Sequence, residues 1–407
     1  MTSRSLAVAG GYYEEICAEP YWHESFGSGG RAAAAVSGRG ASIQLFTYCP
    51  ANHESGLRHF ASTLGFSVTP SPASSKIQFR YLHWLRSPAI LPPREQLEKL
   101  PPIRVEGEAV LRFGLYEGDA VIKAQRAVYD PQDGIRSTAF HENGSDAEEL
   151  VIVCNYGEGV HLTGERDPRR IISTMLGAPR VGAVLLKGAW EGLLAATEST
   201  HEHIEPIPTR SVFKVGSGDI LSAEFSYHWA VLGLDPIAAA REANQRVAYY
   251  CENASLPIPQ TVSITPATIP LLPPVDGEEK RFDVYLAAPF FNAGQLAVVD
   301  EMALLLSQAG VSTFSPYHHV GLGESAKVAA QDLAGLESSR FVLACLDGYD
   351  PGTVFEIGYA RSAKIPVLIY SPNIGEPHIT MFAGTGCEIV RDFTSAIYRA
   401  IWWAKGK

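Results

Sequence analysis

The chain has 407 residues, which is more than one ordinary hydrophobic core accommodates, so the length predicts at least two domains. Its 46% hydrophobic and 19% charged residues are typical of a soluble globular protein. The formal net charge of −11 argues against DNA or RNA as a partner, because proteins that bind these polyanions usually carry a basic face.

Cysteine spacing and hydropathy further limit the class of protein and its cellular compartment. The six cysteines contain no CxxC pair, so the sequence predicts no zinc site and fits a reducing cytosol. The N-terminus lacks the basic-then-apolar pattern of a signal peptide, and no apolar run approaches the roughly 20 residues of a membrane span. We therefore expect a cytoplasmic protein that acts on small molecules and has no membrane partner.

The N-terminal part is predicted to alternate strands and helices. SLAVAGG opens as a strand that runs into glycines, and GSGGRAAAAVSGRG is a glycine turn followed by an alanine-rich helix. Residues 75–125 mix charge, proline and β-branched residues and give no clear prediction. The alternation resumes in AQRAVYDPQDG, ELVIVCNYGE, VGAVLLKGAWEGLLAAT and GDILSAEFSYHWAVLG.

The segment VGSGDILSAEF, residues 215–225, combines a glycine turn with the start of a helix. The backbone N–H groups of the turn would face an anion, assisted by the helix N-terminus. Asp219 could then take a proton from a hydroxyl that attacks a γ-phosphate. A tight loop with a capping aspartate is the structural alternative, since short Gly-x-Gly strings alone are weak evidence.

GSGGRAAAA, VYDPQD, NYGE, KGAWEG and the glycine turn stand in an order that resembles the ribokinase-like (PfkB) carbohydrate and nucleoside kinase family, over roughly residues 5–255. The resemblance implies a Rossmann-like α/β domain with a small β lid, and it implies ATP and Mg²⁺ as cofactors. The implied roles are Asp219 as base, Gly216, Ser217 and Gly218 as anion hole, Asn155 and Glu158 near magnesium and phosphate, and Glu15, Gly29 and Gly30 as substrate-binding residues.

The departures from this family lie on the substrate side. Glu15 replaces the usual aspartate, Ala34 replaces an asparagine, and Phe213-Lys214 replaces an aspartate-threonine pair. Three interpretations follow: an active kinase with an unusual acceptor, a kinase-like domain that only binds a nucleotide, and a scaffold.

The proline-rich stretch 255–281 predicts a stiff, extended linker, because its density of prolines excludes a continuous helix or central strand. We divide the chain into a domain over 1–256, a linker over 257–280 and a domain over 281–407. After the linker, strands are predicted in FDVYLAA, RFVLACLD and IPVLIYS, and helices in AVVDEMALLLSQAG, AKVAAQDLAGLESS and TVFEIGYARSAK. This alternation predicts a parallel sheet covered on both faces, with ligands beyond the carboxyl ends of its strands.

LDGYDPGTVFEIGYA, residues 346–360, places Glu356 where a strand passes into a helix. Thr353 and Glu356 fit a capping box, in which Thr353 is the N-cap and Glu356 only returns a bond to its backbone. Alternatively, Glu356 is a nucleophile that attacks a sugar C1′, kept ionised by the helix N-terminus.

Three further residues suit the catalytic interpretation. Asp350 on the same loop and Asp332 on the preceding helix could face the base, and Tyr285 in the first strand could orient the nucleophile. Each also has a structural explanation: Asp350 before Pro351 suits a turn, Asp332 an exposed helix position and Tyr285 a core aromatic.

VYLAAPFF and QDLAGLESSRFVLACLDGYDPGTVFEIGYA resemble the nucleoside 2-deoxyribosyltransferase family, over roughly residues 281–372. The resemblance implies a flavodoxin-like α/β domain, without a cofactor, that transfers deoxyribose between bases through a covalent glutamate adduct. It also implies a homo-oligomer. The implied residues are Glu356 as nucleophile, Tyr285 as its orienting group, Asp332 and Asp350 as base-facing acids, and Phe290 in substrate binding.

Two departures leave the outcome of the reaction open. EPHITMFAGTGCEIV offers no obvious asparagine of the kind that a neighbouring subunit contributes in family transferases. AAPFFNAGQ lacks the arginine by which related hydrolases hold a 5′-phosphate, so the loop resembles the nucleoside-binding type. Whether a second base or water takes the sugar is not decided by the sequence.

Two histidine groups are predicted to be ordinary surface segments. HEHIE, residues 201–205, is an extended solvated connection, because its histidines are two apart and share no helix face. Tyr317-His318-His319 is predicted to be a loop, with lining of the deoxyribose pocket as the alternative.

The leading hypothesis is therefore an enzyme that cleaves or exchanges an N-glycosidic bond of (deoxy)nucleosides or nucleotides, with an N-terminal domain that binds and phosphorylates a nucleoside or sugar. The alternative hypothesis is a nucleotide sensor, in which a degenerate kinase-like domain regulates the glycosidic domain.

Overall fold

The computed structural model describes residues 4–132, 136–277, 279–373 and 375–406. Its chain divides into two compact units: an N-terminal unit that extends to Thr209 and resumes over Phe213–Thr265, and a C-terminal unit that comprises Arg210–Val212 and the chain from Pro266 onward. The division at Thr265 falls in the proline-rich stretch, whose described residues contain no helix or strand. Asp133, the last residue of VYDPQD, lies outside the described residues.

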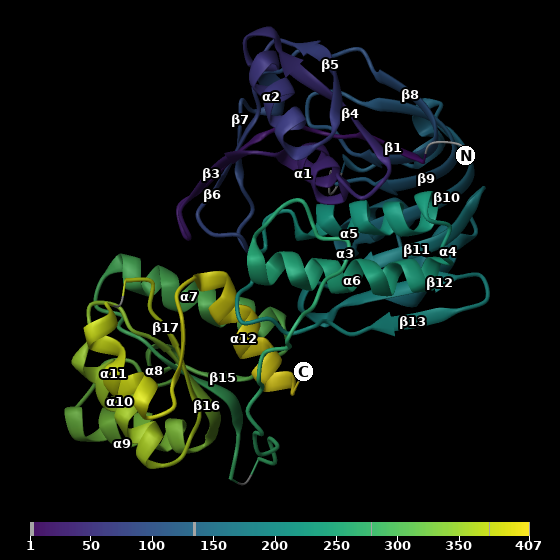
Figure 1. Cartoon of the computed structure of the whole chain (residues 1–407). Coiled ribbons are helices and arrows are strands. Elements are labelled where there is room, and N and C mark those ends of the chain that lie inside the picture. Colours follow the sequence, from purple (N-terminus) through teal and green to yellow (C-terminus); the bar gives the residue numbers. More distant parts are fainter. Residues whose placement is uncertain (1–3, 133–135, 278, 374, 407) are drawn as a thin grey trace. The chain divides into compact units, whose positions relative to one another are not determined.

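The N-terminal unit is built on a nine-stranded sheet of order β13-β12-β11-β10-β9-β8-β1-β4-β5 (Figure 1). The strands from β5 to β11 pair in parallel, and β12 and β13 add an antiparallel edge. Their bounds are β1 (Ser5–Ala9), β4 (Ser42–Pro50), β5 (Ser67–Ala73), β8 (Ile103–Phe113), β9 (Ala120–Asp130), β10 (Asp146–Asn155), β11 (Val181–Lys187), β12 (Leu193–Thr197) and β13 (His201–Ile204).

Helices cover both faces of this sheet. Along β10, Val151 and Val153 join one apolar cluster while Ile152 and Cys154 join the other, which explains why this strand reads as a continuous apolar run. One face is covered by α1 (Gly27–Val36), α2 (Glu54–Leu64), α5 (Ser217–Ser226) and α6 (Pro236–Asn253), and the other by α3 (Tyr156–Thr163) and α4 (Pro168–Leu176). In Figure 1, α5 and α6 lie side by side, and a π-helical turn (Tyr227–Val231) leads from α5 toward α6.

A separate four-stranded sheet confirms the predicted lid. Its order is β3-β2-β6-β7, with β2 (Glu14–Cys17), β3 (Trp22–Ser25), β6 (Gln78–Tyr81) and β7 (Ala89–Leu91). Its residues 78–91 come from the region for which the sequence gave no clear prediction.

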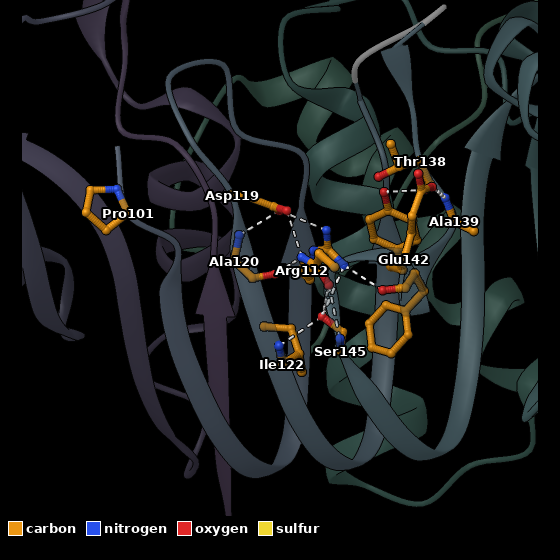
Figure 2. A network of polar contacts seen from close by, with 12 residues as sticks. Pro101, Arg112, Asp119, Ala120, Ile122, Thr138, Ala139, Glu142 and Ser145 are labelled. Atoms are coloured by element: carbon orange, nitrogen blue, oxygen red, sulfur yellow. Dashed lines mark hydrogen bonds and ion pairs between the residues drawn. The ribbon is translucent and has the colours of Figure 1, made fainter. Parts of the chain in front are cut away.

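A buried arginine fixes the loop between β8 and β9. Arg112, 2% exposed, donates to Asp119 Oδ1 at 2.9 Å, to the Phe140 carbonyl at 3.1 Å and to Ser145 Oγ at 3.3 Å. Ser145 Oγ in turn accepts the Ile122 N–H at 3.0 Å, and these contacts converge on the arginine in Figure 2. The network ties the segment 114–119 to both strands.

The C-terminal unit has a five-stranded, wholly parallel sheet of order β15-β14-β16-β17-β18. In chain order this is 2-1-3-4-5, the flavodoxin-like arrangement, so the predicted fold class is confirmed. The strands are β14 (Phe282–Ala287), β15 (Thr313–Phe314), β16 (Ser339–Cys345), β17 (Val367–Tyr370) and β18 (Glu388–Val390).

Helices also cover both faces of the second sheet. Tyr285 and Val342 face the cluster that includes Leu336 and Ile357, whereas Phe341 on the opposite face contacts Trp403 at 5.4 Å. The first face is covered by α9 (Ser325–Glu337) and α10 (Pro351–Ser362), the second by α7 (Ala293–Gln308) and α12 (Phe393–Lys405), and the unit also contains α8 (Pro316–His319) and α11 (Glu376–Gly384).

Two segments predicted to be loops are regular. HEHIE supplies edge strand β13, because a second antiparallel strand completes the hairpin begun by β12, and its exposed His203 bonds the Glu191 carbonyl at 2.7 Å. Tyr317-His318-His319 forms most of the one-turn helix α8, which Pro316 initiates. Among the described residues, no group of three or more histidine, cysteine or acidic side chains is placed to hold a metal ion. Within the same residues, no helix is both long and apolar enough to cross a membrane.

Candidate active sites

The first candidate site lies at the switch point of the C-terminal sheet. β14 and β16 are adjacent and parallel, so the loops after both strands emerge at the same edge. Gln295 connects these loops: its amide Oε1 accepts the Phe291 N–H at 3.0 Å, and its Nε2 donates to Asp347 Oδ2 at 3.2 Å. No sequence pattern indicated this glutamine, because its contact joins residues 52 positions apart.

Tyr285 and Glu356 meet directly at this edge. The Tyr285 hydroxyl donates to Glu356 Oε1 at 2.5 Å, and the tyrosine ring is fully buried and stacked on Phe314 at 5.5 Å. Burial raises the pKa of Glu356 to about 7, the charges of Asp332 and Asp350 raise it too, and the Tyr285 hydrogen bond opposes them. Burial and the neighbouring Glu356 likewise raise the pKa of Tyr285, so its hydroxyl keeps its proton.

Asp332 on α9 lies near this pair. Its charge acts on both Tyr285 and Glu356, and burial raises its own pKa. In the described part of the chain, its buried Oδ1 has no hydrogen-bond partner. Burial of this kind makes an acid easier to protonate, which suits a group that passes a proton to a leaving base.

The predicted capping box is wrong. α10 begins at Pro351, and its N-cap is Asp350, whose Oδ2 accepts the Thr353 N–H at 2.7 Å and the Thr353 hydroxyl at 2.9 Å. The Asp-Pro pair starts the helix three residues before Thr353, because aspartate is a preferred N-cap and proline suits the first helical position. Glu356 therefore lies in the second turn and not at the helix end, so the helix N-terminus does not keep it ionised as predicted.

Aromatic side chains surround the same loops. Phe290 lies 5.6 Å from Tyr317, ring centre to ring centre, and half-exposed Tyr349 lies 5.2 Å from His378. Tyr349 adopts a φ of 54°, which is uncommon for a residue other than glycine. His318 bonds Asp300 at 3.0 Å, so the first of the two adjacent histidines is held in an ion pair with α7 when it is protonated.

The second candidate site is a cavity of about 640 Å³ in the N-terminal unit, within the usual range of small-molecule sites. The predicted Glu15, Asn155, Glu158 and the segment 216–219 line it. Gly29 and Gly30 are not among its lining residues; Gly29 packs so closely on Gly10 that a side chain would not fit. Sequence reasoning missed Arg31, Gln132 and Lys187 as lining residues.

Arg31 connects two of the three predicted functional carboxylates of this cavity, Glu15 and Asp219. Its guanidinium pairs with both oxygens of Glu15 and donates to Asp219 Oδ2 at 3.1 Å, while Gln132 Nε2 donates to Asp219 Oδ1 at 2.6 Å. Arg31 is 1% exposed and also bonds the Tyr250 hydroxyl at 3.1 Å. Both oxygens of the predicted base thus already accept hydrogen bonds from the protein.

Two lysines lie beside the glycine turn. Lys214 donates to Ser217 Oγ at 2.7 Å, and burial lowers the pKa of its ammonium group. Lys187 pairs with both oxygens of buried Asp130, at 2.8 and 3.0 Å, and its Nζ lies 3.7 Å from where a side chain on Gly218 would begin. With the N-terminus of α5, these cations fit a phosphate group.

Two side chains of this cavity, Asn155 and Glu158, are those that the sequence predicted near Mg²⁺. Asn155 and Glu158 form a reciprocal capping box on α3, in which Glu158 Oε2 accepts the Asn155 N–H at 2.8 Å and Asn155 Oδ1 accepts the Glu158 N–H at 2.9 Å. Mg²⁺ is usually held by one or two carboxylates together with substrate phosphates, so Glu158 could supply one such ligand. When bound, the metal would neutralise phosphate charge.

Solved structures resemble the chain over part of its length. A pyrophosphate-dependent kinase in the ribokinase family, with a pyrophosphate analog and myo-inositol, is 14% identical with a TM-score of 0.45, covering 60% of this chain and 93% of that chain. A fructokinase from Vibrio cholerae O395, with fructose, ADP and calcium bound, is 13% identical with a TM-score of 0.47, covering 62% and 94%. A nucleoside kinase from Methanocaldococcus jannaschii, an archaeal member of the ribokinase family, is 12% identical with a TM-score of 0.44, covering 63% and 96%.

At these identities and scores, no function of this chain follows from the matches, and the kinase-like interpretation of the N-terminal unit depends on its own residues. Among curated proteins, none matches the sequence. Residues 284–388, in contrast, match the family model described as nucleoside 2-deoxyribosyltransferase, a range that includes Tyr285, Asp332, Asp350 and Glu356. The C-terminal unit therefore contains a domain of the nucleoside 2-deoxyribosyltransferase family.

Proposed function

We propose that the C-terminal unit cleaves or exchanges the N-glycosidic bond of deoxynucleosides or deoxynucleotides through a covalent intermediate on Glu356. The observation that carries the proposal is the 2.5 Å hydrogen bond from Tyr285 to Glu356, beside Asp332, whose Oδ1 has no hydrogen-bond partner among the described residues. A nucleophile held by a neutral donor and a nearby acid are the two groups that such a reaction requires.

In the first step, one oxygen of ionised Glu356 forms a bond to C1′ while the C1′–N bond breaks. The electron pair of that bond goes to the leaving base, which receives the proton of Asp332. Tyr285 remains protonated and holds the other carboxylate oxygen, which limits the positions that the nucleophile can take.

In the second step, C1′ passes from the Glu356 ester to an incoming nucleophile, and Glu356 leaves as a carboxylate. The incoming group gives a proton to Asp332, which restores the starting state. A second base in this step gives transfer, and water gives hydrolysis.

The test is to incubate the full chain with deoxynucleosides and deoxynucleoside monophosphates, with and without a second free base, and to separate the products by chromatography. We expect released base or a new nucleoside, and the balance between them identifies transfer or hydrolysis. Unchanged substrates, or activity that persists in Glu356→Ala, would contradict the proposal. Mass spectrometry of the denatured protein after brief mixing should show a deoxyribosyl adduct that Glu356→Ala lacks.

For the N-terminal unit, a second candidate function is ligand sensing: it binds a phosphate-bearing ligand without transferring the phosphate and thereby regulates the glycosidic reaction. The contact that favours sensing over phosphoryl transfer is the engagement of both Asp219 oxygens by Arg31 and Gln132. A general base needs an oxygen placed to receive the proton of the acceptor hydroxyl.

This second function is tested by two measurements on the full chain. Consumption of ATP with Mg²⁺ is followed across nucleosides and pentoses, and the glycosidic rate is followed while nucleotides are added. We expect no ATP consumption above that of Asp219→Ala and a changed glycosidic rate. ATP turnover that Asp219→Ala abolishes would instead establish a kinase.

A further inference from the structure

The lid end of the N-terminal cavity is lined by aromatic rings. Tyr13 and Phe79 stack at 5.2 Å, Phe79 and Tyr116 meet edge to face at 6.2 Å, and the Arg94 guanidinium lies 4.5 Å above the Tyr116 ring. Trp84 also lines the cavity. We call Tyr13, Phe79, Tyr81, Trp84 and Tyr116 the aromatic wall. Faces of this kind suit a planar, aromatic ligand.

Trp84 carries an unsatisfied polar atom in this wall. The residue is 7% exposed and packs edge to face on Tyr81 at 5.2 Å. Its indole N–H has no hydrogen-bond partner within the part of the chain that the structure describes. Because this N–H is closed off from solvent, Trp84 offers the cavity its ring surface and not its polar atom.

The same cavity is poorly suited to a polyhydroxylated sugar. Sugar hydroxyls are usually held by carboxylates that accept their protons. Here both oxygens of Glu15 are taken by Arg31, and both oxygens of Asp219 are taken by Arg31 and Gln132. Because Arg31 is fixed further by Tyr250, a sugar hydroxyl would have to share these oxygens with the arginine, and the carboxylates are not free to turn toward it.

The opposite end is suited to one phosphate group. Lys214 and Lys187 lie at the glycine turn, where α5 begins and the positive end of its dipole favours an anion. Arg31 lies between the two ends, since it bonds Glu15 of lid strand β2 and Asp219 of α5. A ligand that satisfies both ends has an aromatic group and a phosphate separated by a short spacer.

We propose that this cavity binds a nucleoside monophosphate, with the base against the aromatic wall and the phosphate at the glycine turn. The proposal rests on the sensing function proposed above and names its ligand class. The ligand is of the same chemical class as the nucleotides on which the C-terminal unit is proposed to act. Its concentration would therefore report directly on substrate or product of that reaction.

The experiment uses the full chain carrying Glu356→Gln, so that the ligand is not consumed, and deoxyadenosine 5′-monophosphate as the probe. Binding is measured by calorimetry and by quenching of tryptophan fluorescence. We expect binding to weaken at least about tenfold when the base is absent, in 2-deoxyribose 5-phosphate, and when the phosphate is absent, in deoxyadenosine. Inorganic phosphate alone should bind weakest.

Three variants assign the signal to this cavity. Trp84→Phe should lose the quenching, because the other five tryptophans lie outside the cavity lining, and should also weaken the calorimetric binding, because Trp84 is part of the aromatic wall. Lys214→Met should weaken deoxyadenosine monophosphate about tenfold and leave deoxyadenosine unchanged, and Lys214→Arg should restore most of the loss. Equal binding of 2-deoxyribose 5-phosphate and the nucleotide, or quenching that persists in Trp84→Phe, would overturn the proposal.

The failure of this proposal can be separated from that of the sensing function. If the nucleotide binds as described and leaves the glycosidic rate of the natural chain unchanged, the ligand assignment holds and sensing is refuted. If another phosphate compound binds and changes the rate, sensing holds and the nucleoside monophosphate is refuted.

Discussion

Asp219 and Glu356 occupy comparable places in their units and have opposite surroundings. Asp219 lies in the first turn of helix α5, and Glu356 lies in the second turn of helix α10. Asp219 accepts hydrogen bonds from a buried arginine and an amide, whereas Glu356 has the neutral Tyr285 hydroxyl and two further acids around it. Sequence position alone therefore does not distinguish a carboxylate held for structure from one left available for chemistry.

The difference has a physical meaning. A carboxylate whose two oxygens are engaged by an arginine and an amide is held in one position, whereas a buried carboxylate beside other acids is destabilised in its ionised form. A carboxylate buried beside other acids lowers the stability of the fold, so its presence is better explained by a role in function. We therefore expect changes at Glu356 to reduce activity and changes around Asp219 to reduce stability.

The largest effect should come from Glu356→Gln. The amide keeps the size of the side chain and can still accept the Tyr285 hydrogen bond, but it cannot form the ester with C1′. We expect the glycosidic rate to fall by at least about 10³-fold, with the fold retained by circular dichroism. Glu337→Gln, an exposed glutamate of α9, is the control and should leave the rate within about twofold. A small loss in Glu356→Gln would show that the carboxylate is not the nucleophile.

The second-largest effect is expected for Arg31→Met, which tests the ion pairs around Asp219. Arg31→Met leaves Glu15 and Asp219 buried without their common cation, so we expect the N-terminal unit to lose about 3–5 kcal/mol of unfolding free energy, measured by denaturant titration. The glycosidic activity should persist under conditions in which the protein stays folded.

Two controls define what the loss at Arg31 means. Arg58→Met removes an arginine from the exposed pair with Glu54 and should cost no more than about 0.5 kcal/mol. Adding Glu15→Gln to Arg31→Met removes one unpaired charge and should recover part of the loss. If Arg31→Met were as mild as Arg58→Met, the ion pair would not be the structural element that the comparison requires.

The sequence predicted what depends on local pattern. The two α/β units and the strand–helix alternation follow from hydrophobic runs and turns, whereas the lid was implied only by the ribokinase-like resemblance. The nucleoside 2-deoxyribosyltransferase resemblance singled out Glu356 and Tyr285, which the structure joins by a hydrogen bond. The start of α10 was also readable, because Asp350-Pro351 is a stronger helix start than Thr353. The capping prediction failed by choosing the second signal over the first.

What the sequence could not predict are partners far apart in the chain. Arg31 and Asp219 are 188 positions apart in the chain, and Gln132 reaches the same carboxylate from the segment that follows β9. The available signal for Arg31 was its place among the glycines and alanines of GGRAAAAV, where a charged side chain in an apolar helix requires a buried partner. Which carboxylates provide it depends on the fold.

A third effect concerns the proton of the leaving base. Asp332→Asn removes the acid that protonates it, so we expect about a 10²-fold fall in rate for bases that leave poorly. The loss should shrink for bases that leave easily, such as nitrophenyl-type leaving groups on deoxyribose. A loss that is equal for all leaving groups would assign Asp332 a structural role, and Glu337→Gln on the same helix again provides the control.

The smallest effect is a shift of pH dependence in Tyr285→Phe. The ionised form of Glu356 is the nucleophile, so the rate should rise with pH through its pKa of about 7, and the Tyr285 hydrogen bond acts to lower that pKa. Its removal should therefore move the acidic limb of kcat/KM to higher pH by about one unit, with about a tenfold loss at pH 6 that largely recovers at high pH. Tyr359 lies on the exposed side of α10, the helix that carries Glu356, and its hydroxyl bonds Glu337 in a similar way. Tyr359→Phe should therefore leave the acidic limb of kcat/KM where it is. A uniform loss at every pH in Tyr285→Phe would mean that the tyrosine supports packing alone, and the contrast between a reactive and a stabilised carboxylate would then rest on Asp332.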